Sequence, residues 1–352
     1  MVVLFAAGGT GGHLYPAFAI AEALRARGDE VHFVGTRDRL EARLVPAAGF
    51  PLHSISAHPL CRRLSFDLLR TIFANLLGIA QSLRIFARVR PDAVIATGGY
   101  VCVPVVIAAR LHRALRRRTM PIALLEPNVL PGVANRVLAP RVDELWNESN
   151  TGVPIRASLT RLPARAESIA RLDLDAQRKT LLVLGGSQGA RSINDALIAL
   201  VETAALPPGW QLLLVTGERD YARVAAAIGE RARVRPYLDD PADAYAAADL
   251  VLARAGASTL AELAALALPA ILVPYPHAAE AHQRANAAAA AEAGAAVVIE
   301  DAALSERLGA LLAQTTAPDR LEAMRARALR GGARDPVRAI LARIDALAAR
   351  RG

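Results

Sequence analysis

The sequence predicts an α/β protein with two Rossmann-like domains, each built on a parallel sheet, and three observations support this prediction. Short apolar segments alternate with longer segments of helical spacing along most of the 352 residues. The apolar segments are hydrophobic throughout, as in parallel strands that helices cover on both faces. An apolar segment, a glycine loop and an amphipathic segment also follow one another twice, in "VVLFAAGGTGGHLYPAFAIAEAL" and in "LLVLGGSQGARSINDALIALV".

The expected strands of the first half lie at residues 1–7, 30–35, 92–99 and 121–127. Helices are expected at 15–28 and 40–49, where apolar residues recur with helical spacing and a glycine ends each segment. The second half repeats the scheme, with expected strands at 180–186, 210–217, 249–254 and 269–274.

The Pro- and Arg-rich segment "TGVPIRASLTRLPARAES" precedes the second half, so we expect the two domains to join near residues 151–165. Ligands of open parallel sheets bind outside the carboxyl ends of the strands. Two domains of this kind are therefore expected to form a cleft with a glycine loop on each wall.

Composition and charge limit the possible partners. The formal net charge is +9, and Lys179 is the only lysine among 42 basic residues. Such a balance suits nucleic acid, anionic membrane or phosphorylated substrates. Nucleic acid is the least expected partner, because no basic segment carries interleaved aromatic residues for base stacking. Cys61 and Cys102 lie far apart in the sequence and lack the spacing of a metal or redox motif. Two such cysteines are typical of a protein in a reducing compartment.

The first 21 residues contain no Asp, Glu, Lys or Arg and imitate a signal or membrane-spanning segment. They lack a basic start, however, and four glycines interrupt them between Gly8 and Gly12. A strand, a tight loop and a helix fit this pattern better. We therefore expect a cytosolic protein without a transmembrane segment.

The loop "GGTGGH" at residues 8–13 is the first candidate for chemistry. Its glycines allow a ligand to approach the backbone closely, and the N–H groups at the following helix start attract anions. His13 is expected in the first helical turn, where the helix dipole disfavours imidazolium and leaves a neutral ring able to accept a proton. The alternative is a histidine with only a packing or surface role.

Three further loops follow expected strands. "LEPNVLPGVANR" carries Glu126 and Asn128 at a strand end, and "GGSQGA" offers the Ser187 hydroxyl to a phosphate. In "RAGASTLAE", residues 254–262, the spacing of Thr259 and Glu262 permits a capping box. The competing interpretation is that this helix start binds a phosphate and that Glu262 reaches a group beyond it.

Taken in order, "GGTGGHLYPA", "TGGYV", "EPNVLPGVANR", "TGVPIR", "GGSQGARSIN", "RAGASTLAE" and "HQRANA" resemble the MurG family. Its members are UDP-N-acetylglucosamine:undecaprenyl-pyrophosphoryl-N-acetylmuramoyl-pentapeptide N-acetylglucosaminyltransferases. The resemblance covers about residues 3–300. It implies a GT-B fold with an acceptor- and membrane-binding domain at 1–155, a UDP-GlcNAc-binding domain at 156–335, and a last helix at about 336–352 that packs back on the first domain.

The resemblance also implies the roles of individual residues. Ser187 and Arg156 would contact the donor phosphates, Glu262 the ribose hydroxyls and Gln283 the sugar hydroxyls, while the backbone of Leu238 would lie against uracil. The remaining substrate-binding positions would be Thr10, Gly11, Gly12, Asn128, Ala257, Ser258, Thr259, Leu260 and Ala261. The sequence departs from the family at "LEPN", where Leu125 and Pro127 replace the usual histidine and glutamine.

The expected reaction is an inverting transfer in which His13, or alternatively Glu126, removes the proton of the acceptor hydroxyl. Neither a metal nor a cofactor is expected. A transferase that acts on diacylglycerol, a UDP-GlcNAc 2-epimerase and a non-catalytic UDP-sugar-binding subunit remain alternatives.

The acceptor is a polyprenyl lipid, so a surface for the anionic membrane is expected as well. Residues 61–90 interleave Phe66, Leu69, Phe73, Leu76, Leu77 and Phe86 with six arginines, and "RLHRALRRR" adds a second basic segment. An ordinary amphipathic helix packed on the sheet is the simpler explanation for part of this stretch. The enzyme is expected at the cytoplasmic face of the membrane as a peripheral protein.

Overall fold

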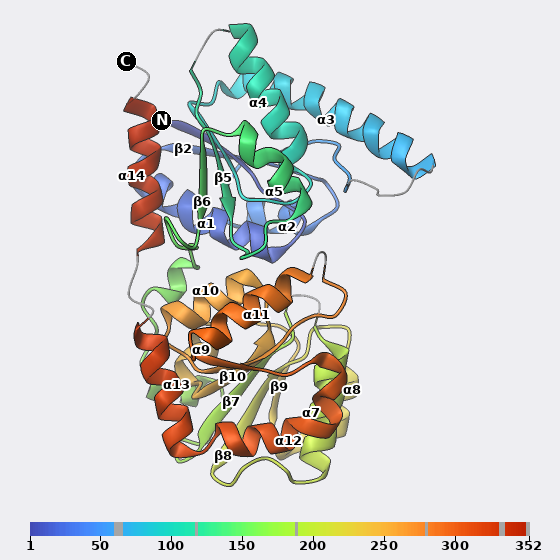
Figure 1. The fold of residues 1–352 in the computed structure, drawn as a ribbon, viewed down its shortest axis with the longest axis vertical. Coiled ribbons are helices and arrows are strands. Elements are labelled where there is room, and N and C mark those ends of the chain that lie inside the picture. The colour runs from blue at the N-terminus through green and yellow to red at the C-terminus, as the bar shows by residue number, and fades with distance from the viewer. Residues whose placement is uncertain (60–65, 117–118, 187–188, 279–280, 331–334, 350–352) are drawn as a thin grey trace. The chain divides into compact units, whose positions relative to one another are not determined.

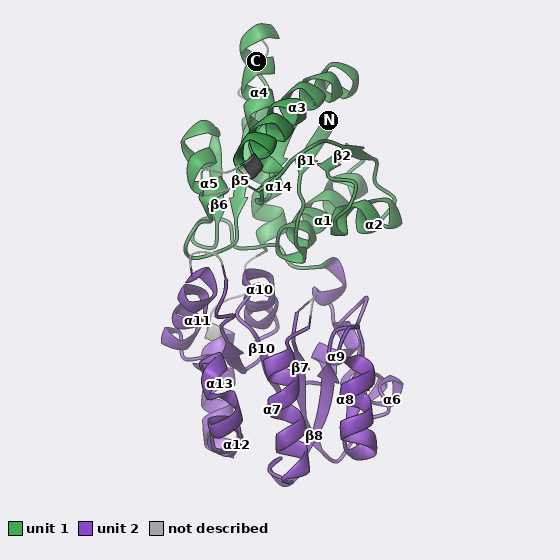
Figure 2. Ribbon diagram, turned by 90° about the vertical axis from the view of Figure 1, so that its right-hand side faces the viewer, with its two compact units in different colours: residues 1–156, 334–352 green, residues 157–333 purple. Residues whose placement is uncertain are grey.

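The structure is a computed structural model that describes the chain except residues 60–65, 117–118, 187–188, 279–280, 331–334 and 350–352. The chain divides into two compact units (Figure 2). Unit 1 comprises Met1–Arg156 and Arg334–Gly352, and unit 2 comprises Ala157–Ala333.

The described part of unit 1 contains a six-stranded parallel sheet in the order β3-β2-β1-β4-β5-β6. The strands are β1 (Val2–Ala6), β2 (Glu30–Gly35), β3 (Leu52–Ser54), β4 (Ala93–Ala96), β5 (Ile122–Glu126) and β6 (Glu144–Asn147). The central strands are buried on both faces, as their continuous apolar sequences require.

Helices cover both faces of this sheet (Figure 1). Alternate residues of β1 point to opposite sides, so that Phe5 packs against one layer and Leu4 against the other. The Phe5 layer contains α1 (Gly11–Ala26), α2 (Leu40–Ala47) and α14 (Pro336–Ala349). The Leu4 layer contains α3 (Phe66–Val89), α4 (Cys102–Arg116) and α5 (Val133–Leu138).

The C-terminal helix α14 belongs to unit 1 although it follows unit 2 in the sequence. Its buried residues Ile340, Ile344 and Leu347 join the core that α1 also builds. At its surface, Arg27 of unit 1 pairs with Asp345 at 2.7 Å. Apolar burial therefore provides most of the attachment of this helix, because exposed ion pairs contribute little.

The described part of unit 2 contains a second six-stranded parallel sheet, in the order β12-β11-β10-β7-β8-β9. The strands are β7 (Lys179–Leu184), β8 (Trp210–Val215), β9 (Arg233–Arg235), β10 (Leu250–Arg254), β11 (Ala270–Val273) and β12 (Ala296–Val298). The helices are α6 (Arg165–Arg171), α7 (Arg191–Glu202), α8 (Tyr221–Ile228), α9 (Ala242–Ala247), α10 (Ala257–Ala265), α11 (His282–Glu292), α12 (Leu304–Thr315) and α13 (Pro318–Arg330).

The two sheets share one topology. If the strands of each unit are counted from its own first strand, both follow the order 3-2-1-4-5-6 found in Rossmann folds. The order reverses between β1 and β4 in unit 1 and between β7 and β10 in unit 2. Ligands bind at such switch points, outside the carboxyl ends of the strands. The loops after these four strands are therefore where a site is expected on each unit.

Candidate active site

His13 lies at the switch point of unit 1, in the first turn of α1. Thr10 is the N-cap residue, and its side chain makes no capping hydrogen bond. The Nδ1 atom of His13 lies 2.9 Å from the carbonyl oxygen of Thr97, which follows β4. A carbonyl oxygen only accepts, so Nδ1 must carry a proton. In the neutral ring the acceptor is then Nε2, the tautomer that a general base at this position requires.

The glycine pair after β4 leaves room for the His13 ring. Gly98 and Gly99 both have positive φ angles, +101° and +85°. A Cβ atom on Gly98 would lie 2.6 Å from Nδ1 of His13, and one on Gly99 would lie 2.8 Å from the Gly8 carbonyl oxygen. A side chain at either position would therefore displace the ring or the first loop, which explains the glycines of "ATGGY".

Glu126 ends β5, and the structure gives its carboxylate a network of donors. Its Oε1 accepts from the backbone and side-chain nitrogens of Asn128, both at 2.9 Å. Its Oε2 accepts from the Gly132 N–H at 3.2 Å and from Nδ2 of Asn135 at 2.8 Å. The side chain is only 3% exposed. Glu126 thus fixes the loop that presents Asn128, and protonating it would weaken these hydrogen bonds.

Glu41 organises the first glycine loop, and the sequence alone did not single it out. This fully buried residue of α2 accepts from the Gly9 N–H at 3.0 Å and from the Thr36 hydroxyl at 2.7 Å. Cβ atoms on Gly8 and Gly35 would lie within 2.7 Å of the Glu41 side chain. The two glycines therefore make space for the carboxylate that holds the loop.

The corresponding loop of unit 2 is only partly described. Ser187 lies outside the described residues, so the expected phosphate contact of its hydroxyl is a prediction that the structure does not address. On either side of it, a Cβ atom on Gly185 would lie 2.7 Å from the Ala190 nitrogen, and one on Gly189 would lie 2.3 Å from the Thr216 carbonyl oxygen. Gly185 therefore allows the backbone just before α7 to lie close, and Gly189 allows the backbone after β8 to lie close.

The start of α10 differs from the capping box that its spacing permits. The helix begins at Ala257, and Gly256 is the N-cap residue. Thr259 already lies inside the first turn and makes no capping hydrogen bond, so the interpretation that it caps the helix is wrong. The first N–H groups of α10 are those that a helix leaves without intrahelical acceptors. Ala257, Ser258 and Thr259 carry these groups, just after β10 ends at Arg254.

Glu262 is 5% exposed, and its Oε2 accepts a hydrogen bond from the Tyr245 hydroxyl at 2.7 Å. This contact orients the carboxylate from α9. Leu260 and Ala261 are half-buried in the same helix. Gln283 lies in α11, where its Oε1 accepts from the Tyr275 N–H at 2.9 Å, and the half-buried Leu238 follows β9.

Arg254, the last residue of β10, joins the loops around this helix start. Its Nη1 donates to Asp301 and to the carbonyl oxygen of Val273, and its Nη2 donates to the Ser192 hydroxyl at 2.9 Å. The arginine therefore ties the end of β11 and the start of α7 to the end of β10. Its partners lie 19 to 62 residues away in sequence, so no local pattern signals the network.

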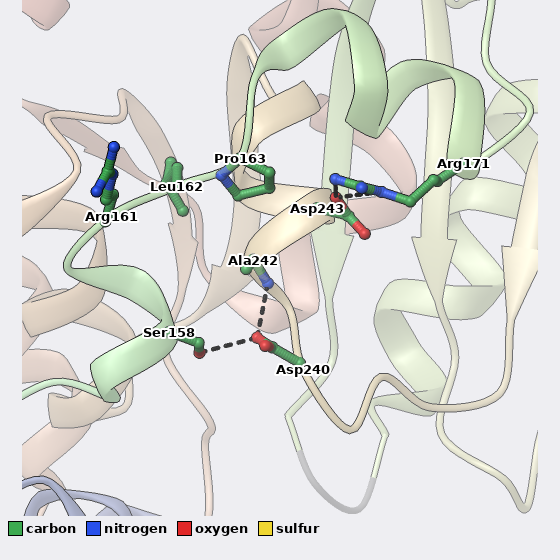
Figure 3. A pocket seen from close by; sticks show the side chains of 8 residues that line it. All are labelled: Ser158, Arg161, Leu162, Pro163, Arg171, Asp240, Ala242 and Asp243. Carbon is green, nitrogen blue, oxygen red and sulfur yellow. Dashed lines mark hydrogen bonds and ion pairs between the residues drawn. The ribbon is translucent and has the colours of Figure 1, made fainter.

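A pocket also lies in unit 2, at the segment that leads into α6 (Figure 3). Its volume of about 560 Å³ is that of a small-ligand site. Among its charged side chains, Arg171 pairs with Asp243 at 2.6 Å, and Asp240 accepts a hydrogen bond from the Ser158 hydroxyl. None of the sequence-predicted site residues lines this pocket.

Among the residues that the structure describes, no group of three or more His, Cys, Asp or Glu side chains is arranged to hold a metal ion. One helix segment, Leu68–Val89 of α3, is long and apolar enough to cross a membrane, with a mean hydropathy of 1.3. Length and composition alone are weak evidence for a span, and the expected absence of one stays a prediction.

Helix α3 has two distinct faces. Residues at helical spacing, Leu69, Ile72, Phe73, Leu76 and Leu77, are exposed, with Phe73 72% accessible. Thr71, Ser82 and Phe86 on the other face are buried. A Cβ atom on Gly78 would lie 2.1 Å from the Ser56 carbonyl oxygen, so this face lies directly against the unit.

Comparisons with known proteins agree with this architecture. Residues 3–146 match the glycosyltransferase family 28 N-terminal domain, and residues 180–340 match the family 28 C-terminal domain. The crystal structure of Acinetobacter baumannii MurG is similar, with a TM-score of 0.77 at 25% identity, covering 98% of this chain and 99% of that one.

Two curated relatives are named UDP-N-acetylglucosamine--N-acetylmuramyl-(pentapeptide) pyrophosphoryl-undecaprenol N-acetylglucosamine transferase. That of Nitrosococcus oceani is 43% identical, covering 88% of this chain and 89% of the relative. That of Frankia casuarinae is 41% identical, covering 99% and 96%. The chain therefore belongs to glycosyltransferase family 28 and, within it, to the MurG family.

Proposed function

We propose that the protein transfers N-acetylglucosamine from UDP-GlcNAc to the 4-hydroxyl of undecaprenyl-pyrophosphoryl-N-acetylmuramoyl-pentapeptide. The observation that carries this proposal is identity of 41–43% to N-acetylglucosamine transferases of that name over most of both chains. The product is the lipid-linked disaccharide precursor of peptidoglycan.

Unit 1 would supply the general base. The tautomer set by the Thr97 carbonyl oxygen directs the Nε2 lone pair of His13 to the acceptor hydroxyl, which loses its proton as the new bond forms. Glu126 is less suited to this step, because four hydrogen bonds engage both oxygens of its carboxylate and tie it to its loop. We therefore assign it the role of holding Asn128, and place Thr10, Gly11 and Gly12 beside the sugars.

Unit 2 would bind most of the donor. The N–H groups at the start of α10 suit the diphosphate, because a helix N-terminus favours negative charge. Glu262, oriented by Tyr245, would accept from the ribose hydroxyls, Gln283 would meet the sugar, and Leu238 the uracil. Ser187 and Arg156 would join the helix start in stabilising the charge that develops on UDP as it departs.

The exposed face of α3 would lie on the cytoplasmic membrane surface. Apolar side chains at Leu69, Phe73 and Leu76 can enter the interface, and exposed arginines at Arg70, Arg84 and Arg88 can meet anionic head groups. The buried opposite face supports peripheral attachment, because a spanning helix would have to leave the core of unit 1.

The proposal is tested with radiolabelled UDP-GlcNAc in three parallel reactions, which contain the lipid-linked muramoyl-pentapeptide, diacylglycerol or no acceptor. Label should move to the lipid phase only in the first reaction. Equal rates with diacylglycerol would support the other transferase class, and epimerised UDP-sugar without acceptor would support an epimerase. UDP-GlcNAc binding without any turnover would support a non-catalytic subunit.

A further inference from the structure

Tyr15 and Arg156 form a stacked pair in unit 1. The Cζ atom of Arg156 lies 3.7 Å from the centroid of the Tyr15 ring. At this distance the guanidinium lies directly on the ring face, where the ring quadrupole attracts a cation. Arg156 is the last residue of the N-terminal segment of unit 1, and Tyr15 belongs to the second turn of α1, so the contact links residues 141 positions apart.

The first turn of α1 supports the Tyr15 ring. Side chains of a helix lean towards its N-terminus, so Tyr15 covers the residue four positions earlier, which is Gly11. A Cβ atom on Gly11 would lie 2.9 Å from the Tyr15 ring. The glycine thus lets the ring lie close to the first turn of α1, and the guanidinium above the ring is held near that turn.

We propose that Tyr15 is a positioning residue that holds the Arg156 guanidinium in place for the diphosphate of the donor. This inference rests on the proposed function, in which Arg156 contacts the phosphates. A long arginine side chain loses rotamer freedom when it binds an anion, and a stacking surface restricts the side chain before the ligand arrives. Removing the ring therefore weakens binding of UDP without removing any group that touches it.

The start of α1 carries two functions. His13 in the first turn and Tyr15 in the second are two residues apart, so the position of this helix start sets both the base and the support of the arginine. A nucleoside such as uridine has no diphosphate for Arg156 to contact. Its affinity should therefore not depend on Tyr15.

The test is a double-mutant cycle read by calorimetric titration of the full chain with UDP, and with uridine as the matched ligand. Tyr15→Leu should weaken UDP binding by about 2- to 30-fold, the range of cation–π energies, while Tyr15→Phe keeps the ring and stays near wild type. Uridine affinity should be equal in all variants. In the Arg156→Ala background, Tyr15→Leu should have no further effect on UDP.

Equal UDP affinity of wild type and Tyr15→Leu would overturn the inference, as would losses that simply add in the double variant. Loss of uridine binding in Tyr15→Leu would assign the tyrosine a general structural role and would also overturn it. Sugar transfer is assayed separately on the wild type. If the double-mutant cycle shows the coupling between Tyr15 and Arg156 but the wild type transfers no sugar, the proposed function is contradicted and this inference still stands.

Discussion

The two candidate bases differ in the hydrogen bonds that their polar atoms already make. His13 uses Nδ1 to contact a backbone carbonyl oxygen, and the remaining ring nitrogen has the lone pair that proton abstraction needs. Glu126 uses both oxygens to bind one loop. A general base must take up and release a proton in each turnover. A carboxylate that holds a loop does so only while it accepts the hydrogen bonds of that loop.

His13→Ala should therefore lower kcat by about 10²- to 10⁴-fold, the usual contribution of a general base, with UDP affinity unchanged. Glu126→Gln should lower Tm, because its amide group places N–H donors against the donors of Asn128 or Asn135. Steady-state kinetics and thermal melting of both variants measure the difference. If folded Glu126→Gln is inactive while His13→Ala turns over normally, the two roles must be exchanged.

Glu262 gives a second prediction for a single residue. Glu262→Ala should weaken UDP binding by roughly 10- to 150-fold if the carboxylate accepts from the ribose, since such bonds are worth about 1.5–3 kcal/mol. It should also lower stability, because the buried Tyr245 hydroxyl loses its acceptor. Titration with UDP and thermal melting measure the two effects separately. Thr259→Ala is the control for stability, because Gly256 is the N-cap residue and this substitution removes no cap. An earlier melt with unchanged UDP affinity would limit Glu262 to a structural role.

Individual residues were predictable from the sequence where local spacing determines their position. His13 was correctly expected in a first helical turn, because a glycine loop and an amphipathic segment flank it. The capping box that the spacing of Thr259 and Glu262 permits was one of two open interpretations, and Thr259 does not cap the helix, because Gly256 takes the extended backbone of the N-cap. Glu41 and Arg254 were not foreseen, since their partners are distant in sequence.

At the scale of elements, the central strands were predictable and the edge strands were not. The central strands are continuous apolar runs that the pattern identifies directly. The edge strands β3, β6, β9 and β12 have three or four residues and are only partly buried, so their sequences carry no continuous apolar signal.

Helix α3 should bind anionic vesicles reversibly, and the binding should weaken as salt rises, because screening reduces the attraction of its arginines. Replacing Phe73 and Leu76 together by Ser should reduce the bound fraction in a vesicle co-sedimentation assay, whereas Leu329→Ser, an exposed leucine of unit 2, should leave it unchanged. Binding that resists high salt and needs detergent for release would indicate deep insertion. Equal binding of all variants would exclude this face as the membrane surface.

The contact between β2 and β3 should make stability depend on pH. His53 lies 3.1 Å from His32 across these strands, and burial, the charge of His32 and that of Arg88 lower its pKa. The unfolded chain binds the proton more readily, so stability falls as the pH drops below about 6.5. His53→Asn should lessen the fall in Tm between pH 7.5 and 5.5. An identical fall in this variant would show that other groups cause it.

At the scale of the whole molecule, a duplicated strand–loop–helix pattern corresponds to two sheets of one topology. The sequence predicts that correspondence because each repeat contains the local signals of its first strand, loop and helix. The membership of α14 in the core of unit 1 depends instead on Ile340 and Ile344 meeting residues far away in the chain. Its amphipathic pattern alone does not specify a partner.

The configuration of the product tests the account most directly. UDP-GlcNAc carries its sugar in the α configuration, and attack by an acceptor hydroxyl deprotonated by one base inverts that carbon in a single displacement. NMR of the purified lipid-linked product should therefore show N-acetylglucosamine joined in the β configuration to the 4-hydroxyl of the muramoyl unit. An α-linked product, attachment at another position or no lipid-linked disaccharide would contradict the account.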